Sequence, residues 1–162
     1  MNIHLIYALA SLAYSNARSG KPASTKAGVL VTQPGDGTLS TIREMAGAMK
    51  MEVQVIRMAQ LIDRGEDVRT VRRHVEDTLA EGKPTIFVLA DAEGADGEMV
   101  MRVTRVIDVA NTSTQVVVMA IGQGVNADVL AMDVAGGMRT SRDFILGSSQ
   151  FEDSMKAVLE RA

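Results

Sequence analysis

The sequence predicts an α/β fold with three layers, in which a mostly parallel five-stranded sheet is flanked by helices. From residue 27 onward, short β-branched runs alternate with helical patterns, an alternation that requires crossovers between parallel strands. The run TIFVLA at residues 85–90 is almost continuously apolar, which is typical of a strand covered on both faces. A length of 162 residues suits one domain with a closed core.

The individual elements follow from local periodicity and from turn residues. The expected strands lie at residues 27–32, 53–58, 85–90, 115–121 and 143–146. The helical patterns, with apolar residues three or four positions apart, lie at residues 39–49, 68–79, 99–110, 128–135 and 151–159. Gly82 and Pro84 end the second of these helices. The strand at 86–89 is expected between those at 29–31 and 116–119.

Residues 1–24 are predicted to form an N-terminal helix and linker, ahead of an α/β domain at residues 25–162. Leu5, Ile6, Leu9 and Leu12 form an apolar stripe at helical spacing. This stripe suits packing on the domain's own sheet or on another subunit. Because no Lys or Arg precedes it and no run reaches 18 apolar residues, we expect a cytoplasmic protein without a membrane span.

Charge and composition argue against several classes of function. Lys and Arg total 17 and Asp and Glu total 20, a net charge of −3, which does not favour binding of nucleic acid through overall charge. The absence of cysteine excludes disulfides, thiolate catalysis and Cys-ligated metals. With His4 and His74 as the only imidazoles, we expect no metal or cofactor.

The segment after the first strand has the frame of a phosphate-binding loop. Glycines let backbone N–H groups wrap around an anion, and the following helix adds a partial positive charge. Gly35 and Gly37 fit that frame, but the G-x-x-x-x-G-K-[ST] pattern also needs a lysine and a hydroxyl. Thr38 and Leu39 stand at those two positions.

From this loop onward, residues 25–162 resemble the large subdomain of AAA+ ATPases. Pro34-Gly35-Asp36-Gly37 stands where Pro-Gly-Thr-Gly is usual in the Walker A loop, so Pro34, Gly35, Asp36, Gly37, Thr38 and Leu39 form a vestigial nucleotide loop. The stretch PTIFVLADAEG resembles Walker B, placing Ala90 at the metal-binding Asp, Asp91 at the catalytic Glu, and Glu93 at the next acidic position. The resemblance implies a P-loop NTPase fold, here expected without the family's helical lid.

Two later stretches continue the resemblance. VVVMAIGQG is similar to the sensor 1 strand, with Gln123 where Asn is usual. GMRTSRDFIL looks like the segment that carries arginine fingers, giving Arg139 and Arg142 as counterparts. Because lysine and the Walker B Asp supply charge stabilisation for phosphoryl transfer, their loss implies weak or absent nucleotide binding and negligible hydrolysis.

Each of these groups also has a purely structural interpretation. Gly35 and Gly37 suit a tight turn with positive φ. The acids Asp91 and Glu93 suit a solvated loop, and Arg139 and Arg142 suit a charged surface. Acidic neighbours of Arg69, Arg72 and Arg73 favour a salt-bridged helix face over a nucleic-acid patch.

Three functions remain at this point. The first is a catalytically inactive AAA+-like domain, a structural or assembly subunit in a homo-oligomer or with an active ATPase partner. The second is an unconventional P-loop-like NTPase with Asp91 as base and Ser40 or Thr41 near the metal. The third is a von Willebrand type A-like adhesion module, whose Asp-x-Ser-x-Ser metal motif has its nearest counterpart in Ser11-x-Ala13-x-Ser15.

Overall fold

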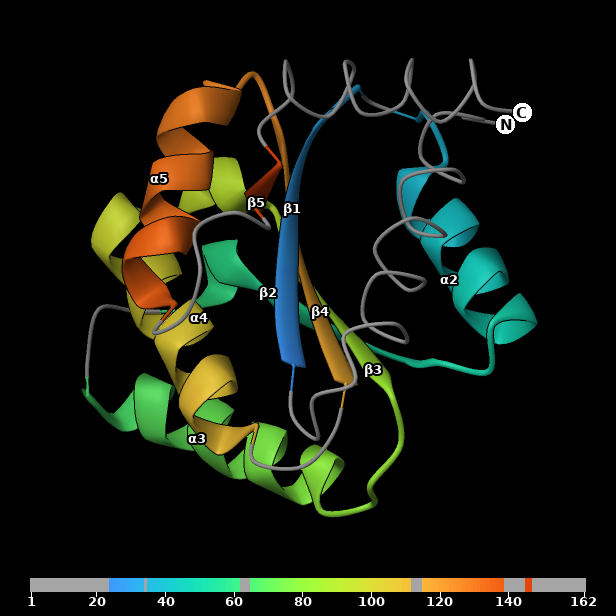
Figure 1. Ribbon diagram of the computed structural model, residues 1–162. Coiled ribbons are helices and arrows are strands. Elements are labelled where there is room, and N and C mark those ends of the chain that lie inside the picture. The colour runs from blue at the N-terminus through green and yellow to red at the C-terminus, as the bar shows by residue number, and fades with distance from the viewer. Residues whose placement is uncertain (1–23, 34, 62–64, 112–114, 139–144, 147–162) are drawn as a thin grey trace.

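The computed structural model describes residues 24–33, 35–61, 65–111, 115–138 and 145–146. Within these residues, a parallel sheet lies between helices on its two faces (Figure 1), as the sequence predicts. The helices expected at residues 5–13 and 151–159 lie outside the described residues. Among the described residues, no helix is both long and apolar enough to cross a membrane.

The sheet has the strand order β2-β3-β4-β1-β5, and every described pairing is parallel. Its strands are β1 (Ser24–Thr32), β2 (Glu52–Arg57), β3 (Thr85–Ala90), β4 (Gln115–Gln123) and β5 (Ile145–Leu146). The prediction of five full strands is corrected. Within the described residues, four strands of six to nine residues build the sheet, and β5 contributes Ile145 and Leu146 beside Ala27 and Gly28. A short apolar run predicts a strand but does not determine how many of its residues pair with a neighbour.

The expected place of β3 between β1 and β4 is also wrong. β4 lies between β3 and β1, with Met119 opposite Val88 and Ala120 opposite Val29. The apolar run correctly predicts that β3 is an interior strand, since all six of its residues are buried. Such a run reports burial on both faces but does not say which strands are the neighbours.

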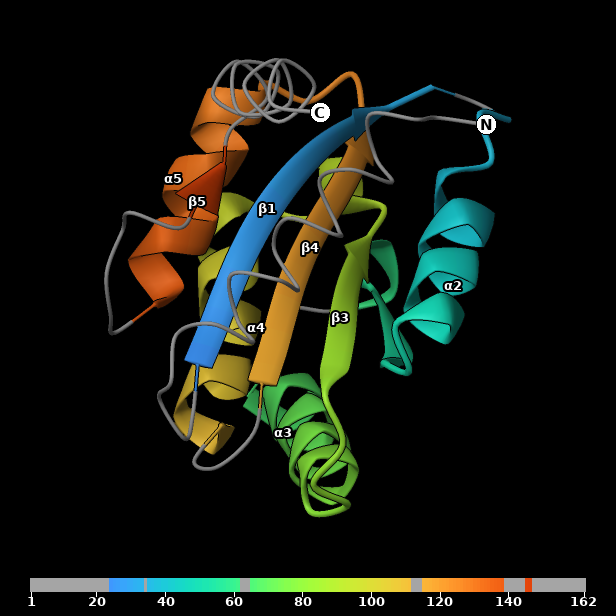
Figure 2. The same cartoon turned by 45° about the vertical axis from the view of Figure 1, so that its right-hand side comes forward.

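The helices divide unequally between the two faces of the sheet (Figures 1 and 2). α2 (Thr38–Ala48) covers one face, and α3 (Gly65–Leu79), α4 (Gly97–Ala110) and α5 (Ala127–Gly137) cover the other. From β1 the chain moves to β2 at one edge of the sheet, and the connections from β2 to β3, β3 to β4 and β4 to β5 then run in the opposite direction along the strand order. Because each crossover is right-handed, this reversal places α2 on one face of the sheet and α3, α4 and α5 on the other. Two short 3-10 helices, η1 (Met58–Gln60) and η2 (Ala92–Gly94), were not predicted.

Side chains of the interior strands alternate between two hydrophobic cores, because successive residues of a strand point to opposite faces. In β3, Ile86 and Val88 pack in the core that contains Ile42 of α2. Phe87 and Leu89 pack in the larger core under α3, α4 and α5. Both cores anchor the strand ends from which the loops of the site emerge.

β1 and β4 are neighbours whose following helices leave to opposite faces of the sheet. In open α/β sheets, a crevice forms at the carboxyl ends of the strands at such a switch point. The topology therefore points to the loops after β1 and β4 as the place for a ligand.

Candidate functional site

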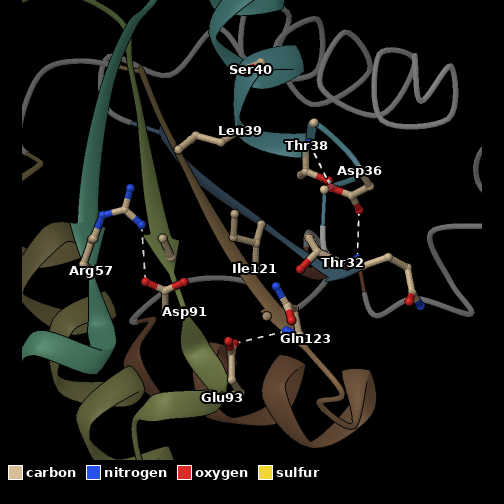
Figure 3. Close-up of a pocket in the computed structure, with 15 residues that line it drawn as sticks. Thr32, Asp36, Thr38, Leu39, Ser40, Arg57, Asp91, Glu93, Ile121 and Gln123 are labelled. Carbon is tan, nitrogen blue, oxygen red and sulfur yellow. Dashed lines mark hydrogen bonds and ion pairs between the residues drawn. The ribbon is translucent and has the colours of Figure 1, made fainter.

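A cleft of about 230 Å³ lies at this switch point (Figure 3). It brings together residues from the ends of all four long strands and from the first turn of α2. Its lining residues are Thr32, Gln33, Gly35, Asp36, Gly37, Thr38, Leu39, Ser40, Arg57, Ala90, Asp91, Glu93, Ile121, Gly122 and Gln123. The cleft thus unites the predicted Walker A, Walker B and sensor positions, while Pro34, Arg139 and Arg142 lie outside the described residues.

The loop after β1 is a tight turn that leads directly into α2. Gly35 and Gly37 have φ of 72° and 70°, a left-handed backbone that glycine adopts without steric cost. The Asp36 N–H donates to the Gln33 carbonyl at 3.2 Å, and the Thr41 N–H donates to the Gly37 carbonyl at 2.9 Å. This is the geometry that the tight-turn interpretation of the two glycines requires.

The carboxylate of Asp36 binds the loop that carries it. Its Oδ2 accepts the Gln33 N–H at 2.9 Å, and its Oδ1 accepts the Thr38 N–H at 3.0 Å and the Thr38 hydroxyl. Partial burial raises the pKa of Asp36, but hydrogen bonds from Gln33 and Thr38 outweigh it, so the pKa lies below its usual value. The group is therefore ionised at neutral pH, with two backbone donors of the loop already bound to it.

The side chains at the two predicted Walker A positions, Thr38 and Leu39, lie in different directions. Thr38, at the lysine position, is buried and turned back onto Asp36. Leu39, at the hydroxyl position, extends over the cleft (Figure 3). In the motif, the first glycine lies five residues before the glycine that Gly37 matches, and that position holds Thr32. This departure was missed by sequence reasoning.

The segment after β3 presents two carboxylates to the cleft. Ala90, at the metal-carboxylate position, is buried at the end of β3. Asp91 has a left-handed backbone with φ of 54°, and its Oδ2 lies 3.3 Å from Nη1 of Arg57. Arg57 was not among the predicted site residues. Its position at the carboxyl end of β2 was the available signal, because parallel strands end at the same edge.

Glu93 is held against the end of β4. Its Oε2 accepts the Gln123 N–H at 3.1 Å. A Cβ atom built on Gly122 would lie 2.9 Å from the same oxygen, so the missing side chain of Gly122 lets Glu93 approach the strand. The predicted sensor residue therefore contributes its backbone, and not its side chain, to this contact.

The described lining of the cleft is acidic. Asp36, Asp91 and Glu93 face one cation, Arg57, which is paired with Asp91. No group of three or more potential metal-ligating side chains occurs among the described residues. The Ser11-x-Ala13-x-Ser15 segment of the adhesion-module hypothesis lies outside them. This lining is electrostatically unfavourable for a polyphosphate.

Comparison with known proteins identifies the class of fold. No protein-family model matches the sequence, and no curated protein matches it. The crystal structure of Cdc6p from Pyrobaculum aerophilum, an AAA+ ATPase, is similar, with a TM-score of 0.57 and 15% identity. The match covers 94% of this chain and 48% of that one, so this chain spans about half of its length. The likeness shows a P-loop/AAA+-like fold.

Proposed function

We propose that this chain is a catalytically inactive AAA+-like domain that acts as a structural or assembly subunit through protein contacts. The observation that best supports a loss of ATP binding and hydrolysis is that the carboxylate of Asp36 accepts the N–H groups of Gln33 and Thr38. A phosphate entering the loop would have to displace this internal anion from those donors. It would also approach a negative charge without the compensating lysine.

The other side of the cleft supports the same proposal. Arg57 is the one basic residue in the described lining, and its guanidinium already faces Asp91. With Ala90 at the Walker B position, Mg²⁺ lacks its carboxylate partner. We therefore expect no micromolar affinity for ATP and no turnover.

The unconventional NTPase is the second candidate. The left-handed backbone of Asp91 favours it, because strained residues cluster at functional sites. Two contacts weigh against it. Asp91 is paired with Arg57, and the hydroxyl of buried Thr41 donates to the Gly37 carbonyl at 3.0 Å. Ser40 is exposed on the cleft and remains the candidate metal ligand of that hypothesis.

Calorimetric titration with ATP and Mg²⁺ separates the two candidates. The native chain should give no saturable binding at micromolar ATP, and its ATPase rate should equal that of a heat-inactivated sample. Asp36→Thr/Thr38→Lys frees the loop donors and restores the cation, so it should gain measurable ATP binding without turnover, because Ala90 is unchanged. Asp77→Lys, on the exposed side of α3, changes the net charge by the same amount and is the matched charge control. Saturable micromolar binding by the native chain would overturn the proposal.

The assembly role needs surfaces that a partner can cover. Among the described residues, Val31, Val109, Val129 and Met132 are large hydrophobic side chains exposed to solvent. Apolar surface of this kind is typical of protein interaction sites when it is clustered. Arginine is enriched at interfaces, so Arg139 and Arg142 are proposed to lie on a contact surface. A cytoplasmic location stays a prediction.

Light scattering tests the assembly role on the native chain and on Arg139→Glu/Arg142→Glu. The native chain should be larger than a monomer or capture a stable protein partner, and charge reversal should weaken the assembly. A native chain that stays monomeric at high concentration and captures no partner would refute the role. A charge-reversed variant that assembles equally well would remove the two arginines from the interface.

A further inference from the structure

The helical layer has a second hollow, which shares no lining residue with the cleft. A groove of about 310 Å³ lies between α3 and α4, and we name it the arginine groove. Its lining residues are Val68, Arg72, Glu76, Arg102, Arg105, Val106, Val109 and Ala110. Val109 is 49% exposed, so part of the apolar lining is open to solvent. The groove therefore combines an uncovered apolar surface with a net positive charge.

Two of the three arginines are held in place by neighbouring groups. The Arg102 Nη2 lies 2.8 Å from Oε1 of Glu98, one turn earlier on α4. The Arg105 Nη2 donates to the Gly136 carbonyl at 2.9 Å. Fixed guanidinium groups lose less conformational freedom when they bind a carboxylate. The presence of Glu76 and of apolar side chains in the lining favours an acidic protein surface over the phosphate backbone of a nucleic acid.

The same chain carries a surface with the opposite character. Val129 and Met132 of α5 are 56% and 72% exposed, and Asp128 is exposed beside them. Residues three and four positions apart share one side of a helix, so these three side chains form a single patch, the α5 face. α5 contains two aspartates and no basic residue. The opposite side of the helix, with Leu130 and Val134, is buried in the core.

We propose that a second copy of this chain places its α5 face in the arginine groove, an inference that rests on the proposed assembly role. Met132 and Val129 would cover the apolar lining around Val109, which removes apolar surface of both copies from water. Asp128 would approach the arginines of the rim, where charge-assisted hydrogen bonds form. The two surfaces share no residue, and Figure 1 shows α3, α4 and α5 on one side of the sheet. One molecule can therefore offer both surfaces at once.

Sedimentation velocity of the full chain over a range of concentrations tests this contact. Met132→Lys removes the most exposed apolar side chain and places a cation against the arginines. Arg72→Glu reverses one rim charge. Each should raise the dissociation constant for self-association by about tenfold or more. Arg43→Glu, an exposed reversal on α2 across the sheet, should leave it unchanged.

A mixing experiment makes the test specific. Asp128→Arg alone should weaken self-association. A mixture of Asp128→Arg with Arg72→Glu should recover it, because the native α5 face of the Arg72→Glu copy meets the native arginine groove of the Asp128→Arg copy. The double variant Asp128→Arg/Arg72→Glu should also recover it, because the swapped charges are again opposite in every contact. If Met132→Lys and Arg72→Glu associate as well as the native chain, the contact does not exist. A different outcome is that the native chain is monomeric and binds a labelled oligonucleotide, whereas Arg72→Glu does not bind it. The groove then binds nucleic acid and the proposal fails.

The two interface proposals fail separately. Loss of association in Arg139→Glu/Arg142→Glu but not in Met132→Lys refutes the α5 contact and leaves the assembly role intact. A native chain that is monomeric and has no partner refutes both.

Discussion

Asp36, in the loop after β1, binds donors of its own loop, whereas Asp91 and Glu93, after β3, bind groups of the neighbouring strands β2 and β4 (Figure 3). All three carboxylates line one cleft. The first closes its loop upon itself through contacts within three residues in sequence. The other two connect segments that are 34 and 30 residues apart.

This difference separates a loop in which two N–H groups are bound by the loop's own carboxylate from an acidic wall in which Asp91 is paired with Arg57. Backbone N–H groups at a helix start normally attract anions, and here a side chain of the loop supplies the anion. Across the cleft, the ion pair of Asp91 with Arg57 uses the one cation of the described lining. The proposed loss of phosphate binding therefore rests on two separate contacts, and variants can address them separately.

The largest effect is expected from a charge placed in the core at β3, the strand that precedes Asp91 and Glu93. Val88 is fully buried between strands, so Val88→Asp leaves an unpaired carboxylate in the core and should cost at least about 3 kcal/mol of unfolding free energy. Because domains typically have about 5–15 kcal/mol in total, the variant should be largely unfolded. Circular dichroism and urea titration measure this. Val129→Asp, at a 56% exposed position, is the matched control. A Val88→Asp melting temperature within a degree or two of the native value would contradict an interior β3.

A smaller effect should separate the two kinds of carboxylate. Asp36→Ala removes the acceptor of two backbone N–H groups beside the start of α2 and should cost about 1 kcal/mol, as the loss of a helix cap does. Asp91→Gly loses an exposed ion pair but relieves a left-handed backbone, so its unfolding free energy should stay within about 0.5 kcal/mol of native. Urea titration of both variants decides. Equal losses would mean that Asp36 does not organise its loop.

The dependence of stability on pH should identify the Asp36 contribution. Because its folded pKa is below the unfolded value, ionised Asp36 stabilises the fold above that unfolded value. The contribution is lost as the pH falls through the folded pKa. The difference in unfolding free energy between native and Asp36→Asn should be constant near neutral pH and shrink below roughly pH 4. A difference that grows on acidification would reverse the sign and contradict the hydrogen-bonded carboxylate.

The smallest effect is expected at the contact of Glu93 with β4. In Gly122→Ala, the new Cβ meets Oε2 of Glu93, the end of a flexible side chain that can move away. The cost should be below about 1 kcal/mol, within the range of one exposed hydrogen bond. Glu93→Gln/Gly122→Ala should be no less stable than Gly122→Ala alone if the two positions act through one contact. Additive losses in urea titration would contradict this.

Sequence reasoning was most successful for features set by nearby residues. Residues 85–90 were predicted exactly as β3, since a continuous apolar run bounded by Pro84 and a polar loop leaves little freedom. The tight turn at Gly35 and Gly37 was likewise correct, because positive φ is a local demand that glycine meets. Both features depend on contacts within a few positions.

Strand order, the pairing of Arg57 with Asp91 and the opposed charges of the arginine groove and the α5 face were decided by the tertiary structure alone. Alternating and continuous apolar patterns indicate how deeply a strand is buried, but they do not identify its neighbours. The patterns would be the same whether β3 or β4 lay beside β1, and the structure places β4 there. Likewise, the periodicity of α3 and α4 places Arg72 and Arg102 on their own helices but does not say that both reach one groove. The sequence by itself thus determined the four long strands, the helices α2 to α5 and the tight turn. Crossover direction and packing, which join segments 30 or more residues apart, decided which of those residues meet.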